Sequence, residues 1–157
     1  MTIALARIDD RLVHGQVVVG WGRPLRAAFV AVVDDALAAS EWEQELYRLG
    51  APDDLPLEFV TVAQAVTRRA AWDADPGPGI VLLADIDTAT ALAAVGVRFP
   101  QLNLGGVHHR PGRTERVPYV FLTDAELAAL QGLAASGVEV TAQDVPATRP
   151  VPLAELG

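Results

Sequence analysis

The chain has no lysine and no cysteine among its 157 residues, so all twelve of its basic residues are arginine. The absence of cysteine excludes disulfide bonds and thiolate metal sites. The absence of lysine excludes a Walker-type phosphate loop and a Schiff-base enzyme, because both depend on a lysine amine. It also excludes a response-regulator receiver domain, which needs a lysine on a late strand.

Long apolar runs and an excess of positive charge are also missing. No apolar run approaches the ~20 residues of a membrane-spanning helix. The first residues lack a basic segment followed by a long apolar one, so we expect no signal peptide and a cytoplasmic location. The formal net charge of -8 argues against a nucleic-acid partner, whose phosphates require a basic surface.

Short apolar runs alternate with segments of helical spacing along the chain, which predicts a single α/β domain over residues 1–157. We expect an open, mainly parallel twisted sheet of about six or seven strands with helices on both faces. The predicted strands are 3–6, 27–33, 57–60, 80–84, 101–104, 119–122 and 138–145. One predicted helix begins near Gln16, and the others cover 36–49, 61–72, 88–95 and 123–135. The residues from Pro146 onwards are expected to be loosely held.

The first predicted strand ends in a dense polar cluster. Its members are Arg7, Asp9, Asp10, Arg11 and His14. A strand, a charged turn with one histidine and the start of a helix together form a corner suited to phosphate, because backbone N–H groups and the helix dipole favour an anion there. Other strand ends on the same edge are expected at Asp34-Asp35, Ala84-Asp85 and Gly105-Gly106.

His14 is the candidate reactive group of this cluster. A neutral imidazole nitrogen can attack a phosphoryl group and form a phosphohistidine. The carboxylates of Asp9 and Asp10 can orient the ring, and Arg11 can contact phosphate oxygens. The residues do not decide which carboxylate faces His14. A simple salt-bridged turn is the alternative interpretation of Asp9, Asp10 and Arg11.

The segment from Arg7 to Trp21, RIDDRLVHGQVVVGW, resembles the active-site segment of a known family. It is similar to the IIB component of the mannose/fructose/sorbose-type sugar phosphotransferase system (PTS), with Val13 in place of the usual isoleucine. A second similarity lies in Leu102–Gly106 (LNLGG), followed by Gly112–Thr114 (GRT). Because length and element order also agree, the resemblance extends over essentially the whole chain.

The resemblance implies that His14 is phosphorylated on Nδ1, with Asp9, Asp10 and Arg11 as its catalytic neighbours. The residues expected to bind phosphate or face a partner are Val13, Gly15, Gln16, Gly105 and Gly106. The implied function is a phosphoryl carrier that accepts phosphate from a IIA phosphohistidine and passes it to a sugar brought by the membrane components IIC and IID. No metal or cofactor is implied, and a homodimer is left open. The alternatives are a regulatory protein of this fold that senses phosphorylation state and, with less support, a small-molecule-binding domain.

Two further pairs of residues invite functional interpretations. Asp34-Asp35 is similar to the acidic pair of a receiver domain, but without the lysine a cap for the next helix is favoured. His108-His109 suggests a metal site, yet adjacent histidines in extended chain point apart and no third ligand is suitably spaced. We therefore interpret His108-His109 as part of a polar loop. The tryptophans at 21, 42 and 72 lie on apolar helical faces and are predicted to be in the core, with Trp21 also able to flank the site.

Asp85 departs from the family pattern, in which a small hydroxyl residue usually follows the buried strand at 80–84. An ionised carboxylate at ~6 Å from a phosphoryl group would repel it by about 5 kcal/mol as an upper limit. We therefore predict that Asp85 turns away to cap the helix beginning near Thr88, or pairs with an arginine such as Arg11 or Arg110.

Overall fold

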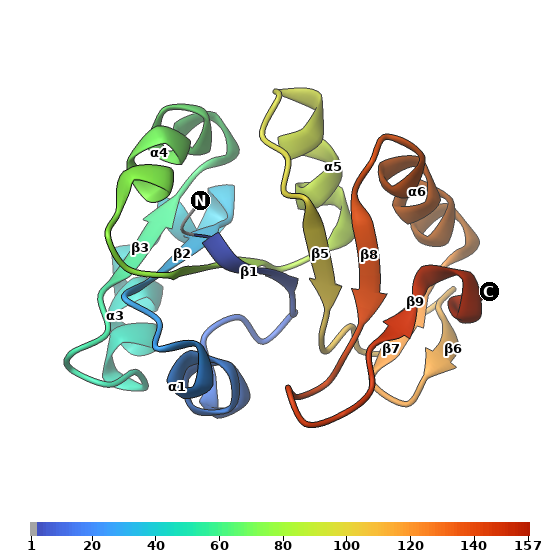
Figure 1. The fold of residues 1–157 in the computed structure, drawn as a ribbon, viewed down its shortest axis with the longest axis horizontal. Coiled ribbons are helices and arrows are strands. Elements are labelled where there is room, and N and C mark those ends of the chain that lie inside the picture. Colours follow the sequence, from blue (N-terminus) through green and yellow to red (C-terminus); the bar gives the residue numbers. More distant parts are fainter. Residues whose placement is uncertain (1–2) are drawn as a thin grey trace.

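The structure is a computed structural model that describes residues 3–157 and shows one α/β unit built on a seven-stranded sheet (Figure 1). The strand order is β3-β2-β4-β1-β5-β8-β9. The strands are β1 (Ile3–Ile8), β2 (Phe29–Val33), β3 (Leu57–Val60), β4 (Gly79–Leu83), β5 (Gln101–Leu104), β8 (Glu139–Ala142) and β9 (Val151–Pro152). The paired strands are parallel except β8 and β9, which are antiparallel. The predicted fold class is confirmed.

Helices cover both faces of the sheet. The helical segments are η1 (Gln16–Trp21, a π-helix), α1 (Gly22–Leu25), α2 (Asp35–Ala38), α3 (Glu41–Leu49), α4 (Val62–Ala74), α5 (Ile86–Ala94), α6 (Asp124–Ala135) and η2 (Leu153–Leu156, a 3-10 turn). The buried side chains of α4, α5 and α6 share one core with one face of the sheet, whereas those of η1 and α2 share a second core with the other face. Within residues 3–157, no helix is both long and apolar enough to cross a membrane.

Strands β2 and β4 are buried along their whole length, which explains why their sequences are continuous apolar runs. In β2, Val30 and Val32 face one core while Ala31 and Val33 face the other. Two of the longer helices, α4 and α6, begin with capping boxes at Thr61 and Thr123.

The predicted helix 36–49 is wrong as a single element. The chain leaves helical geometry at Ser40, which separates α2 from α3. Helix α3 packs on the sheet through Tyr47, whose ring lies 6.2 Å from that of Phe59. Trp42 consequently faces away from the core and is 67% exposed, so its predicted core position is wrong. Trp21 and Trp72 are buried, as predicted.

The polar stretch after β5 contains a strand that the sequence pattern did not predict. Strand β6 (Thr114–Val117) forms an antiparallel hairpin with β7 (Val120–Leu122), separate from the main sheet. Strand β6 lacks an apolar pattern because its first two residues, Thr114 and Glu115, are both exposed.

The prediction of a loosely held C-terminal tail is also wrong. Strand β8 ends at Ala142, earlier than predicted, and β9 then pairs with it as the edge strand of the sheet. The following turn η2 inserts Leu156 into the main core, where it is 2% exposed. Figure 1 shows this segment, drawn in red, folded back beside β8 and the hairpin. The prolines after Pro146 therefore mark a turn and an edge strand.

The loops that follow β1 and β5 meet at the carboxyl edge of the sheet. β1 is the middle strand, with β4 on one side and β5 on the other. The N–H of Gly105 donates to the carbonyl of Ile8 at 2.8 Å, and the N–H of Asp10 donates to the carbonyl of Gly106 at 2.9 Å. Chain connections leave β1 and β4 towards opposite halves of the sheet, and such switch points are where open α/β sheets place their sites.

Candidate functional site

Two charged side chains enter the interior at the end of strand β1, Arg7 on the strand and Asp9 directly after it. Arg7 and Asp9 are two residues apart, so they point to the same side of the strand, and both are fully buried. Nη2 and Nε of Arg7 donate to Oδ2 of Asp9 at 3.2 and 3.4 Å. Burial lowers the pKa of Arg7, while the neighbouring Asp9 acts in the opposite direction.

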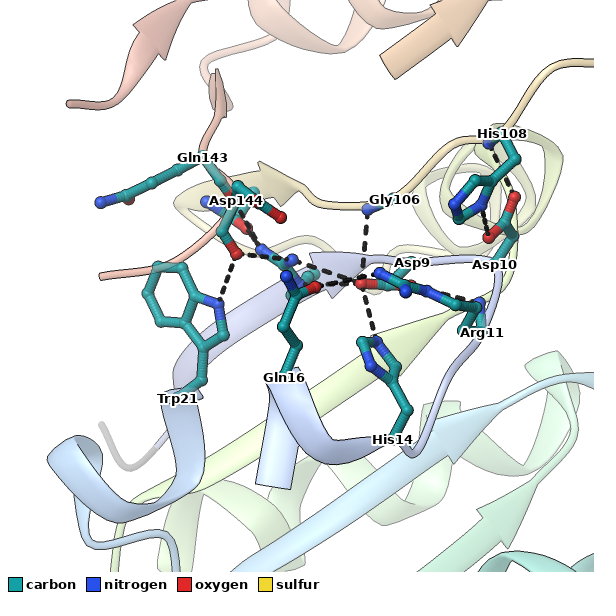
Figure 2. A network of polar contacts seen from close by, with 12 residues as sticks. Asp9, Asp10, Arg11, His14, Gln16, Trp21, Gly106, His108, Gln143 and Asp144 are labelled. Atoms are coloured by element: carbon teal, nitrogen blue, oxygen red, sulfur yellow. Dashed lines mark hydrogen bonds and ion pairs between the residues drawn. The ribbon is translucent and has the colours of Figure 1, made fainter. Parts of the chain in front are cut away.

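The guanidinium of Arg7 is enclosed by groups distant in sequence, and Figure 2 labels three of these residues, Trp21, Gln143 and Asp144. Its Nη1 donates to Oδ1 of Asn103 and, at 2.7 Å, to the carbonyl of Gln143. Its Nη2 also donates to the carbonyl of Asp144 at 3.0 Å, and its Cζ lies 5.2 Å from the centre of the Trp21 ring. No individual role was predicted for Arg7 or Asn103 from the sequence. Asn103 was detectable as a polar residue inside an otherwise apolar strand.

Asp9 links Arg7 to His14. Its Oδ2 lies 3.1 Å from Nε2 of His14 and accepts from the N–H of Gly106 at 3.3 Å. Nε2 of His14 is buried, and its contact with Asp9 is at ion-pair distance without the alignment of a full hydrogen bond. Oδ1 of Asp9 accepts from the N–H of Arg11 at 3.1 Å. Asp9 is therefore the carboxylate that faces His14.

The pKa of Asp9 is lowered below its ordinary value. Burial alone would raise it, but the contact with His14, the charge of Arg7 and the N–H of Arg11 together outweigh that effect. Asp9 is thus a carboxylate at neutral pH, held between an arginine and a histidine.

Asp10 faces the other way and holds His108. Its Oδ1 lies 2.6 Å from Nδ1 of His108, and its Oδ2 accepts from the N–H of the same residue at 2.8 Å. The neighbouring His109 packs edge-to-face on Phe121, with ring centres 5.7 Å apart. The prediction that the two adjacent histidines point apart is confirmed. Within residues 3–157, no group of three or more histidine, aspartate and glutamate side chains is placed to hold a metal ion.

The loop that carries His14 is anchored by its apolar residues. Leu12, which has a positive φ of 56°, and Val13 are both buried in the second core. His14 follows with 18% of its side chain exposed. Its carbonyl accepts from the N–H groups of both Val17 and Val18, which begins the π-helix η1. The side chain of Val13 is thus a structural anchor, while His14 stands at the surface.

Two kinds of group in this loop are left free for a ligand. Nδ1 of His14 makes no hydrogen bond to any of the residues 3–157 and is not among the buried atoms. The backbone N–H groups of residues 13–16 likewise donate to no group in the described part of the chain. Arg11, with 47% of its side chain exposed, lies beside them, and its Nη2 donates to Oε1 of Gln16 at 3.0 Å. The free groups include the backbone of Val13, Gly15 and Gln16, which the sequence analysis singled out.

Gly105 and Gly106 allow the side chains of the site to approach the backbone. A Cβ at Gly105 would lie 2.2 Å from the guanidinium of Arg7, which is a direct clash. A Cβ at Gly106 would lie 3.0 Å from Cε1 of His108 and 3.3 Å from Nη2 of Arg11. The N–H groups of both glycines are already used within the chain, by Ile8 and Asp9. The close approach is therefore by the protein's own side chains.

Asp34 and Asp85 both cap helices. Oδ1 of Asp34 accepts from the N–H of Leu37 at 2.8 Å, which confirms the capping interpretation. Oδ1 of Asp85 accepts from the N–H and the hydroxyl of Thr88 at 2.8 and 2.7 Å. Asp85 is thus the N-cap of α5, which begins at Ile86, and the first of the two predicted outcomes is confirmed.

We expect Asp85→Ala to lower the free energy of unfolding by about 1 kcal/mol, because the cap is lost while the helix remains. Phosphoryl transfer should change by less than about twofold, since the side chain bonds to its own helix. Urea denaturation and a transfer assay at pH 7 check the two expectations. A large increase in transfer rate would instead mean that the carboxylate repels the phosphoryl group.

The geometry is that of a histidine held on one nitrogen by a buried carboxylate and open on the other, beyond the carboxyl end of the middle strand of a mainly parallel sheet. A family model described as PTS system sorbose subfamily IIB component matches residues 3–156. The chain belongs to this family.

Relatives and solved structures of IIB components agree with the assignment. The chain is 32% identical over 146 residues to an N-acetylgalactosamine-specific phosphotransferase enzyme IIB component 1 of Escherichia coli, covering 92% of this chain and 91% of that protein. It is equally similar to the mannose-specific EIIAB component of the same organism, but spans only 45% of it. The IIB domain of the sorbose permease of Klebsiella pneumoniae superimposes with a TM-score of 0.88 at 28% identity, covering 99% of this chain and 96% of that one.

As a PTS IIB component, the protein is a phosphotransferase and a phosphoryl carrier in sugar uptake. This confirms the function implied by the resemblance, and none of the relatives favours the regulatory alternative.

Proposed function

We propose that His14 is the residue that carries the phosphoryl group, accepting it on Nδ1 from a phosphohistidine of a IIA protein. The observation that carries this proposal is the asymmetry of the ring: Nε2 is buried against Asp9, while Nδ1 makes no bond within residues 3–157. The carboxylate favours a proton on Nε2, so the lone pair of the ring is on Nδ1. From there it can attack the phosphorus atom of the donor.

The transfer is a displacement between two imidazoles. The lone pair of His14 Nδ1 forms the new P–N bond, and the P–N bond to the donor breaks with its electron pair returning to the donor ring. The proton on Nε2 stays opposite Asp9 throughout. The free N–H groups of residues 13–16 and the guanidinium of Arg11 offer hydrogen bonds to the phosphoryl oxygens, which stabilises charge through positioning.

Membership of the family supports a proposal for the partners and the location. We propose that a IIA protein is the donor and that IIC and IID components bring the sugar that receives the phosphate. The mannose-specific relative is named an EIIAB component and is about twice as long as this chain, which supports a IIA partner. A site that exchanges phosphate with such proteins would work on the cytoplasmic side of the membrane.

The central experiment incubates the chain with a phosphorylated donor cascade and locates acid-labile phosphate by mass spectrometry. We expect one phosphate, on His14. Passage of that phosphate to a sugar in vesicles containing IIC and IID would support the full relay. Phosphorylation without transfer to any sugar would favour the regulatory alternative.

Arg11→Ala is expected to slow phosphoryl transfer by on the order of tenfold to a thousandfold, the usual scale for loss of one charged stabiliser. Arg11→Lys should recover only part of the rate, because a point charge does not reproduce a planar fork. Quenched-flow labelling of the three proteins measures this. Equal transfer rates in all three proteins would mean that Arg11 only stabilises the turn and takes no part in transfer.

A further inference from the structure

The buried pair formed by Asp9 and His14 raises a chemical difficulty for a nucleophilic histidine. A buried carboxylate 3.1 Å from an imidazole nitrogen favours the doubly protonated imidazolium. In that form Nδ1 carries a proton and has no lone pair for phosphorus. The carboxylate that selects the useful tautomer would therefore also suppress its reactivity, unless part of its charge is taken up elsewhere.

We propose that Arg7 is a positioning residue that takes up this charge and so keeps His14 in its neutral, nucleophilic form. This inference rests on His14 being the phosphoryl acceptor. Arg7 would act through Asp9, without touching the phosphoryl group.

The contacts of Asp9 support this role. Two nitrogens of Arg7 and Nε2 of His14 all lie within 3.4 Å of the same oxygen, Oδ2, so they compete directly for its charge. Arginine remains protonated in proteins, so its share of the carboxylate is constant across the physiological pH range. Its positive charge, close to His14, also disfavours a second proton on the imidazole. Both effects have the same sign.

The fixation of Arg7 is more extensive than a simple ion pair requires. Asn103, the carbonyls of Gln143 and Asp144, and the face of Trp21 define the plane of the guanidinium. Gly105 leaves the space that it fills. The fork is thus aimed at Oδ2 by groups from β5, from the loop after β8 and from η1.

Other charged and titratable groups of residues 3–157 also lie near this pair. Asp144 and Tyr119 act on the charge of Arg7 from the loop after β8 and from the β6–β7 turn. Arg11 lies 3.8 Å from Oδ1, but its side chain is 47% exposed and therefore screened by water. Arg11 is accordingly the matched control, being a second arginine beside Asp9 that contacts the other oxygen.

The test compares Arg7→Gln, Arg7→Lys and Arg11→Gln with the unmodified protein. NMR of the His14 ring gives its titration midpoint, and labelling with phosphoramidate at pH 5.5–8.5 gives the pH profile without a protein donor. We expect Arg7→Gln to raise the titration midpoint of His14 by about one pH unit or more. The acidic limb of the pH–rate profile should move to higher pH by the same amount. At a pH on that limb, this corresponds to about a tenfold slower reaction. Arg7→Lys, which keeps the charge, and Arg11→Gln should shift them by less than half as much.

An unchanged midpoint in a folded Arg7→Gln protein would overturn the inference, because a merely structural role changes stability and leaves the titration of His14 in place. If Arg7→Gln fails to fold, the pair Asp9→Asn and Asp9→Asn/Arg7→Met replaces it. In the Asp9→Asn protein there is no carboxylate whose charge Arg7 could take up, so the further loss of Arg7 should change the titration midpoint of His14 little. A change as large as the one caused by Asp9→Asn itself would contradict the mechanism. Labelling of His14→Ala would refute the acceptor assignment separately, whatever the Arg7 variants do.

Discussion

His14→Ala is expected to abolish phosphorylation completely, because the chain then lacks the nitrogen that we propose forms the P–N bond. The fold should be retained, since His14 lies in a loop whose anchors are the buried side chains of Leu12 and Val13. Incubation with the phosphorylated donor, followed by mass spectrometry under alkaline conditions, measures incorporation. Circular dichroism and the thermal midpoint verify the fold.

Two matched controls are available in the chain itself. His108→Ala and His109→Ala remove histidines that are engaged by Asp10 and by Phe121. Both proteins should still accept one phosphate. Phosphate incorporated into His14→Ala, or lost from His108→Ala, would show that the acceptor had been assigned to the wrong histidine.

Asp9→Asn is expected to reduce transfer by on the order of 10²- to 10⁴-fold. An amide is neutral and can present either an oxygen or an NH₂ group to Nε2, so the imidazole is no longer held in the tautomer with its lone pair on Nδ1. The replacement of a histidine-orienting aspartate by asparagine in serine proteases has an effect of this size. Single-turnover labelling with the phosphorylated donor measures the loss.

The same substitution should lower the free energy of unfolding by about 3–5 kcal/mol, because it leaves the buried charge of Arg7 without its partner. Asp10→Asn is the control, since its partner His108 is half exposed and the cost should stay below about 1 kcal/mol. Urea denaturation at pH 7 compares the two. Equal costs would mean that the pair Arg7–Asp9 contributes no more than a surface contact.

The lowered pKa of Asp9 also sets the direction of a pH dependence. A carboxyl group whose pKa is depressed by folding stabilises the fold at pH values above its unfolded pKa of about 3.9. That contribution disappears as the pH falls through the lowered value. The difference in stability between the unmodified protein and Asp9→Asn should therefore shrink below about pH 4.

Local pattern was sufficient for much of this molecule. The continuous apolar runs of β2 and β4 predicted buried parallel strands, because a strand covered on both faces has no polar side. The acidic residues at Asp34 and Asp85 were predicted to cap helices, because a short carboxylate after a strand bonds the N–H three residues on. The position of His14 between a strand and a helix was likewise readable from its neighbours.

The same local rules failed where the position of a side chain or segment depends on contacts with parts of the chain that are distant in sequence. Helical spacing marked an apolar face around Trp42, but α3 uses Tyr47 to contact the sheet and turns Trp42 outward. The tail from Pro146 was predicted to be loosely held, yet β9 pairs with the free edge of β8 and Leu156 packs into the core. Edge pairing and core insertion depend on which surfaces the rest of the chain leaves open, and that is not a property of the tail's own sequence.

The sequence by itself determined that a histidine, two aspartates and an arginine would gather after the first strand. Only the tertiary structure decided that Asp9 faces His14, that Asp10 holds His108, and that Arg7 lies behind Asp9. The physical reason is the separation of the partners along the chain. Arg7 bonds Asn103 and Gln143, 96 and 136 residues away, and Asp10 bonds His108, 98 residues away. Adjacent aspartates are locally equivalent, so their roles diverge only when folding brings the loops after β5 and β8 to the end of β1.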